Sequence, residues 1–259
     1  MVLDCQNEES ALQSVAIYFD TDVEKIKKIL IEHNFEKLFE KCCNKYDYFD
    51  DFLYDYFRRK FGAGKLEYVM WFHLSRSLCP MDYYEGIRPL NVILPKIQKD
   101  LYALVSEKIN ENEWQEICRG TASGFREWRY NMKISDRCHY GPYAMLVREI
   151  AFNSSIVGNH DYLNIPEIIE DMCMDVKKIY GIDLIGRFVR RASPVIVKFK
   201  EQLNDDEKDR QYIGTTLTYL HNKLHKEKLC LMCNTCYSGY GNDINKNDIV
   251  SVEILDNEK

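Results

Sequence analysis

The chain has 259 residues, of which 46% are hydrophobic and 29% are charged, and these values exclude a generally disordered protein. Its 35 lysines and arginines against 41 aspartates and glutamates give a formal charge of −6, which argues against a broad nucleic-acid-binding surface but still allows a local basic patch. No apolar run approaches the roughly 20 residues that cross a bilayer, so no membrane association is expected.

The cysteine content bears on the cellular compartment. The chain holds ten cysteines, and residues 1–5 lack the basic and apolar segments of a secretory signal. Cysteines in such a chain are expected to be reduced thiols or metal ligands rather than disulfides. The sequence therefore predicts a cytoplasmic protein.

The first sixty residues have a helical pattern. Thr21-x-x-Glu24 has the form of a capping box at the start of one helix. A further helical segment is expected from about residue 35 toward residue 60, and its many aromatic side chains could form a partner-binding face, although their helical spacing favours a packed core. Because glycines at 62 and 64 end this pattern, the sequence predicts a helical segment over 1–62 and an α+β domain over 63–259.

Over the rest of the chain, segments with the apolar spacing of helices alternate with short apolar or alternating segments typical of strands. Helices are predicted where apolar residues recur at helical spacing, with Asn164 as the cap of one of them. The expected helices lie at 96–109, 165–180 and 207–226, and the expected strands lie at 68–72, 143–147, 188–189, 195–199 and 250–254. The predicted fold class is therefore a mostly helical α+β fold, with a mixed, mainly antiparallel sheet and surrounding helices.

The first candidate functional group follows the strand at 68–72. His73 and Arg76 lie where a buried strand runs out toward a loop, and functional groups are common at such places. His73 could donate a hydrogen bond to a ribose or pyrophosphate oxygen, and the planar guanidinium of Arg76 suits a phosphate. The plainer interpretation, a structural histidine and a surface cation, is left open by the sequence.

Two further segments carry candidate residues. In the segment 139–143, Tyr143 could stack on a flat heterocycle, or it could be a core aromatic after a Gly-Pro turn. The segment 237–243 is rich in glycine and tyrosine and precedes the last strand. Near that strand, Asp248 and Glu253 are rival candidates for an acid that stabilises developing positive charge on a sugar carbon.

A strand ending in histidine, a short helix, a Gly-Tyr-rich region and a last strand preceded by an acid resemble the ADP-ribosyltransferase superfamily, at scattered points from about residue 66 to 255. In its histidine–tyrosine–glutamate branch, the histidine and a tyrosine hold the nicotinamide and its ribose. The resemblance implies that His73 and Arg76 position NAD, that Tyr143 stacks on nicotinamide, and that Asp248 or Glu253 supplies the acid. Asp248 stands where the family usually has glutamate, and no His-Gly pair follows the first strand.

The function implied by this resemblance is that of a glycosyltransferase acting on NAD, which would transfer ADP-ribose to protein, nucleic acid or water. The partners would be NAD and an unknown macromolecular acceptor. The sequence predicts no particular oligomeric state.

A separate chemical signal is the run Cys230-x-x-Cys233-x-x-Cys236, just after His221 and His225. Thiolates and imidazoles are good zinc ligands, so a structural zinc site could use the three cysteines and His225. Unmetallated thiols and an iron–sulfur cluster are the alternatives. The second functional hypothesis is therefore a non-enzymatic intracellular interaction protein with a small structural zinc site.

Overall fold

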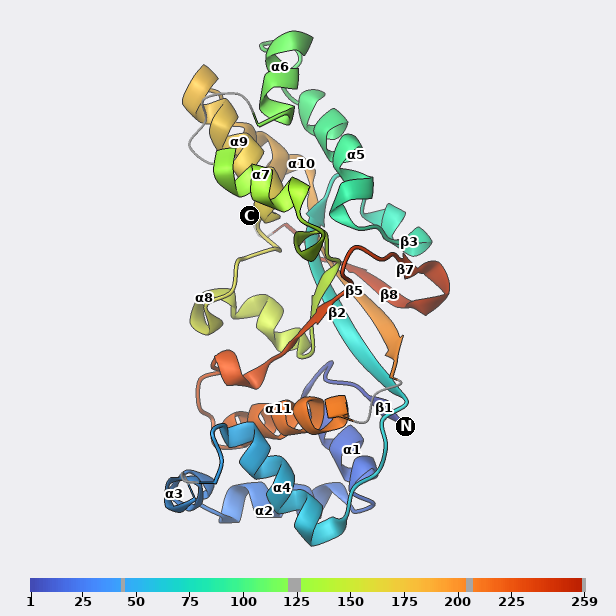
Figure 1. The fold of residues 1–259 in the computed structure, drawn as a ribbon, viewed down its shortest axis with the longest axis vertical. Coiled ribbons are helices and arrows are strands. Elements are labelled where there is room, and N and C mark those ends of the chain that lie inside the picture. The colour runs from blue at the N-terminus through green and yellow to red at the C-terminus, as the bar shows by residue number, and fades with distance from the viewer. Residues whose placement is uncertain (43–44, 121–126, 204–206, 258–259) are drawn as a thin grey trace. The chain divides into compact units, whose positions relative to one another are not determined.

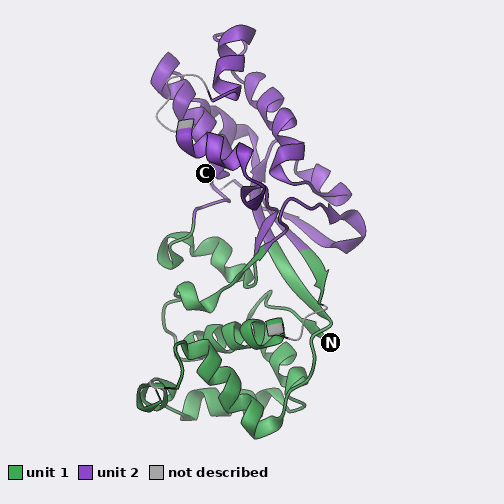
Figure 2. Cartoon of the chain, in the orientation of Figure 1, with its two compact units in different colours: residues 1–72, 145–159, 199–237 green, residues 73–144, 160–198, 238–259 purple. Residues whose placement is uncertain are grey.

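The computed structural model describes residues 1–42, 45–120, 127–203 and 207–257 (Figure 1). Helices surround a mainly antiparallel sheet, so the predicted α+β fold class is confirmed. Contacts along the chain divide it into two compact units, each assembled from three separate stretches (Figure 2). The boundary that the sequence suggests after residue 62 stays a prediction.

Unit 1 comprises residues 1–72, 145–159 and 199–237. Its helices pack around aromatic side chains, among which Phe35, Phe52 and Phe57 are buried, so the packed-core interpretation of these three aromatics is confirmed. Its elements are β1 (Val2–Leu3), α1 (Glu8–Tyr18), α2 (Val23–Glu32), α3 (Phe35–Lys41), α4 (Phe49–Phe61), α8 (Ser154–Val157) and α11 (Glu207–Leu224), with the short 3-10 helices η3 (Arg148–Phe152) and η4 (Leu231–Cys233).

Helix α4 packs along α11, and a glycine permits the close approach. A Cβ atom added to Gly214 of α11 would lie 2.7 Å from the main-chain oxygen of Asp50 in α4, which is too close for any larger side chain. The N-terminus of α1 is fixed by the side chain of Asn7, which accepts a hydrogen bond of 2.9 Å from the amide of Ser10. Local capping and long-range packing therefore act together in this unit.

Unit 2 comprises residues 73–144, 160–198 and 238–259. Its core lies between helices and includes the buried side chains of Trp114, Met172 and Phe188. Its elements are α5 (Leu90–Tyr102), α6 (Glu111–Cys118), α7 (Glu127–Ser135), α9 (Glu167–Tyr180), α10 (Leu184–Arg191), β3 (Gly86–Ile87), β7 (Ile244–Asn245) and β8 (Ile249–Ile254), with the 3-10 helices η1 (Pro80–Glu85), η2 (Arg137–His139) and η5 (Lys246–Asp248).

The main sheet has the strand order β6-β4-β2-β5-β8, with β1 paired to β2. Its remaining strands are β2 (Tyr68–Ser77), β4 (Tyr143–Met145), β5 (Ser193–Gln202) and β6 (Cys236–Ser238). Strand β1 runs parallel to β2, whereas β4 runs antiparallel to it with Phe72 opposite Met145. Strand β5 lies between β2 and β8, so the strands of His73 and Glu253 are separated by one strand.

Several predicted boundaries are corrected by the structure. The segment expected to be helical from residue 35 to 60 is two helices, α3 and α4, and the helix expected at 96–109 is α5, which begins and ends earlier. The pair at 188–189, expected as a strand, lies inside α10, because a two-residue apolar run fits a buried helical face equally well. The cap of α9 is Pro166 rather than Asn164, and the cap of α2 is Asp22 rather than Thr21.

Candidate functional site

Segments that the sequence singled out separately meet in unit 2. The Nδ1 atom of His73 in β2 lies 2.7 Å from the main-chain oxygen of Tyr143 in β4. The amide of Gly239 donates to the main-chain oxygen of Pro142 at 2.9 Å, and that of Gly241 donates to the oxygen of Gly141 at 2.7 Å. The loop before Tyr143 and the Gly-Tyr-rich loop are thus joined by main-chain hydrogen bonds, beside the strand that carries His73.

The imidazole of His73 has a defined tautomer in this setting. A carbonyl oxygen only accepts hydrogen bonds, so Nδ1 must carry the proton that it shares with Tyr143. Burial lowers the pKa of His73, and the hydrogen bond to Tyr143 offsets part of this effect. The side chain is half-buried and neutral at pH 7, which makes Nε2 an acceptor. With Nδ1 engaged, the donation by His73 that the sequence predicts would have to come from Nε2 and would require the disfavoured charged form.

One aromatic ring lies beside this imidazole, and a second tyrosine is on the neighbouring strand. The ring of Tyr83, in η1, lies 5.6 Å from that of His73, centroid to centroid, and its hydroxyl is hydrogen-bonded to Ser75. Burial raises the pKa of Tyr83 above its ordinary value. Tyr143 is 39% exposed, and its hydroxyl donates to the main-chain oxygen of Cys138. Burial also raises the pKa of Tyr143, so both phenols stay neutral near pH 7.

The two candidate acids lie on elements that pack against η1. Asp248 ends η5 and Glu253 lies in β8, and both side chains are half-buried. Helix η1 packs against both η5 and β8. An ion pair joins Glu85 of η1 to Lys246 of η5, with 3.4 Å between Oε2 and Nζ. The helix that brings Tyr83 to His73 therefore also packs against the segments that carry both acids, and their role stays a prediction.

Arg76 is held by main-chain oxygens from distant parts of unit 2. Its side chain is 8% exposed. Its Nε donates to Leu163 at 2.8 Å, and one terminal nitrogen lies 2.9 Å from the oxygens of both Val189 and Ala192 and 2.8 Å from Oδ1 of Asn257. A phosphate contact by Arg76 stays a prediction, and it would have to compete with these bonds.

The cysteine run lies at the end of unit 1. The sulfurs of Cys230 and Cys233 are 3.6 Å apart, and the sulfur of Cys236 lies 3.6 Å from that of Met145. Burial raises the pKa of Cys233 to about 12. The Nε2 atom of His225 lies 2.9 Å from the main-chain oxygen of Leu30. Over the described part of the chain, no three ligating side chains gather into a group that could hold a metal ion, and the predicted zinc site stays a prediction.

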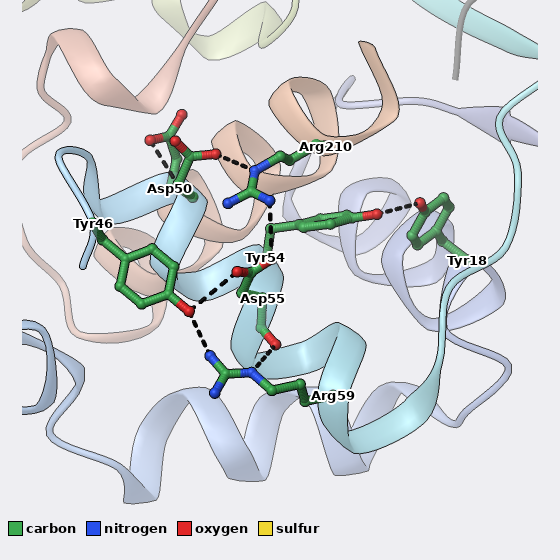
Figure 3. A network of polar contacts seen from close by, with 8 residues as sticks. Tyr18, Tyr46, Asp50, Tyr54, Asp55, Arg59 and Arg210 are labelled. Atoms are coloured by element: carbon green, nitrogen blue, oxygen red, sulfur yellow. Dashed lines mark hydrogen bonds and ion pairs between the residues drawn. The ribbon is translucent and has the colours of Figure 1, made fainter. Parts of the chain in front are cut away.

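Unit 1 contains a polar network that the sequence did not predict (Figure 3). Arg210 of α11 pairs with Asp51 and Asp55 of α4, and Asp55 also accepts a hydrogen bond of 3.1 Å from the hydroxyl of Tyr46. Arg59 donates to that same hydroxyl at 2.6 Å. The spacing of Asp51, Asp55 and Arg59 at four-residue intervals on one helix face was the signal that could have revealed it. The network ties α4 to α11.

Comparisons with protein families, with curated proteins and with solved structures give no match for this chain. Among the helices that the structure describes, none has the length and apolar character needed to span a membrane.

Proposed function

We propose that the protein cleaves the nicotinamide–ribose bond of NAD, either hydrolysing NAD or transferring ADP-ribose to a macromolecular acceptor. The observation that carries this proposal is the cluster around the neutral imidazole of His73, in which Nδ1 is held by Tyr143 and the ring lies 5.6 Å from that of Tyr83. This arrangement fixes an acceptor nitrogen beside the ring of Tyr83, with the partly exposed Tyr143 on the neighbouring strand β4, a combination suited to a ribose hydroxyl attached to a flat heterocycle.

In the proposed reaction, Nε2 of His73 accepts a hydrogen bond from a hydroxyl of the nicotinamide ribose, and the exposed ring of Tyr143 stacks on nicotinamide. The bond from the ribose carbon to the ring nitrogen breaks, and its electron pair leaves with nicotinamide. Asp248 or Glu253 stabilises the positive charge that develops on the sugar. Water or an acceptor oxygen then bonds to that carbon and gives up its proton to the solvent.

The cytoplasm is the proposed location. The cysteines that the structure describes are free thiols, and thiols persist in a reducing compartment. Immunofluorescence of the tagged chain, with fractionation as a check, tests this assignment.

The test of the activity is release of nicotinamide from NAD by the purified chain, measured by chromatography, with cell extract added to supply acceptors. His73→Asn should keep the donor to Tyr143, because an asparagine amide can replace Nδ1–H, but it removes the Nε2 acceptor. We expect a loss of about 10²-fold or more in rate, as for other positioned groups in catalysis.

The matched control is His160→Gln. His160 also contacts a main-chain oxygen, that of Ile165 at 2.6 Å from Nε2, and a glutamine amide can replace that donor. This variant should retain full activity. A folded wild-type chain that releases no nicotinamide, and whose melting temperature does not rise with NAD, would overturn the proposal and favour an interaction protein without enzymatic activity.

A further inference from the structure

The sequence run of three cysteines contains a pair with a special geometry. The 3-10 helix η4 folds the chain back, with the amide of Cys233 donating to the main-chain oxygen of Cys230 at 3.0 Å. This turn brings the two sulfurs to 3.6 Å, and the amide of Cys230 points at the sulfur of Cys233 at 3.5 Å. A disulfide needs about 2.05 Å, so closure asks each sulfur to move by less than about 1 Å.

Two thiols alone cannot complete a zinc site, which takes four ligands. The third cysteine of the run, Cys236, contacts Met145 and Asn234 instead. The residues that the structure describes hold no group of three ligating side chains. Two thiols do suffice for a disulfide.

We propose that Cys230 and Cys233 form a reversible intramolecular disulfide when the chain meets a small disulfide oxidant such as oxidised glutathione. This modification site is independent of the proposed cleavage of NAD.

Exposure decides the order of the two exchange steps. Cys230 is exposed and is followed by Leu231, which is 65% exposed, whereas Cys233 is fully buried. The thiolate of Cys230 therefore attacks the oxidant first, which forms a mixed disulfide and releases one glutathione thiolate. The Cys233 thiol then loses its proton to the solvent, and its sulfur, held 3.6 Å from that of Cys230, attacks the Cys230 sulfur, so that the second glutathione leaves as a thiolate. Overall, two protein thiols are oxidised and one glutathione disulfide is reduced to two thiols.

The test uses the full chain, held folded in oxidised glutathione and then quenched with acid and alkylated. Trypsin cuts after Lys228 and Lys246, so all three cysteines of the run fall in one peptide. We expect that peptide to lose two hydrogens, with fragmentation placing the bond between Cys230 and Cys233. Treatment with dithiothreitol should restore two alkylated thiols.

Three serine variants separate the steps. Cys233→Ser should accumulate the mixed disulfide on Cys230, because the resolving thiol is missing. Cys230→Ser should remain unmodified at Cys233, which is buried. The matched control Cys236→Ser should form the disulfide as the wild type does.

Wild-type peptide mapping alone can overturn the proposal, so it does not depend on how the variants fold. The proposal is wrong if Cys236 forms a disulfide with Cys230 or Cys233, or if a stable mixed disulfide remains on Cys230 of the wild-type chain. It is also wrong if the disulfide forms only after the chain has unfolded, as judged by loss of the far-ultraviolet circular dichroism signal. None of these results depends on whether the chain cleaves NAD.

Discussion

Replacing Arg76 with leucine tests whether its guanidinium is a structural group. The side chain is buried and donates to the main-chain oxygens of Leu163, Val189 and Ala192 and to the side-chain oxygen Oδ1 of Asn257. Each hydrogen bond from a charged group contributes about 1.5–3 kcal/mol, and a buried oxygen left without a donor costs about 1–3 kcal/mol. Because the four contacts come from only two donor nitrogens, we count two such bonds, about 3–6 kcal/mol, and leucine recovers part of this through apolar burial. We therefore expect the free energy of unfolding to fall by about 3–5 kcal/mol.

The assay is urea unfolding at pH 7, followed by circular dichroism and by tryptophan fluorescence, whose transitions must coincide before a free energy is extracted. Arg76→Lys keeps the charge but loses the planar guanidinium, so its free energy of unfolding should lie between those of the wild type and the leucine variant. The control Arg191→Leu removes an exposed arginine of α10 and should change stability by less than about 0.5 kcal/mol. A loss below about 1 kcal/mol in Arg76→Leu would refute the structural role.

Two further perturbations test packing and burial. Gly214→Ala should lower the melting temperature, because the new Cβ would lie 2.7 Å from the main-chain oxygen of Asp50. Overpacking costs about 1–3 kcal/mol, which is more than alanine gains in helix propensity. An unchanged or higher melting temperature would contradict the close packing of α4 and α11. Burial, and next the charge of His225, lowers the pKa of His221 in the folded chain. His221 therefore binds a proton more readily in the unfolded chain, so the free energy of unfolding should fall as pH drops below about 6.5. His221→Gln should reduce the difference in melting temperature between pH 7.5 and 5.5, and a difference as large as that of the wild type would argue against this origin.

The sequence predicted helices and strands best where a hydrophobic pattern continued over many residues. The strand expected at 68–72 is present but continues to residue 77, through Ser75 and Arg76, which are both buried. Polar residues usually end a buried strand, and here they do not, because Arg76 finds its acceptors 87 to 181 residues further along the chain. A local sequence pattern cannot predict hydrogen-bond acceptors that lie so far along the chain.

The candidate site was predictable in its parts but not in its assembly. A histidine directly after an apolar run and tyrosines beside glycine-rich turns are visible in the sequence. Their meeting depends on the pairing of β2 with β4 and on main-chain bonds between two loops about 100 residues apart. The contact of Tyr83 with His73 was not predicted, because nothing in the sequence of a short 3-10 helix indicates which residue its tyrosine will pack against.

The discontinuous make-up of the two units has a practical consequence for anyone dissecting this protein. Each unit draws on three stretches of chain, and helix α4 near the start packs on α11 near the end. Truncation from either terminus therefore removes pieces of an intact whole instead of liberating a self-contained fragment. Minimal versions would have to be built by rejoining stretches with new connections. Loss of the proposed activity in a simple deletion would therefore indicate a disrupted fold before it indicated a missing functional group.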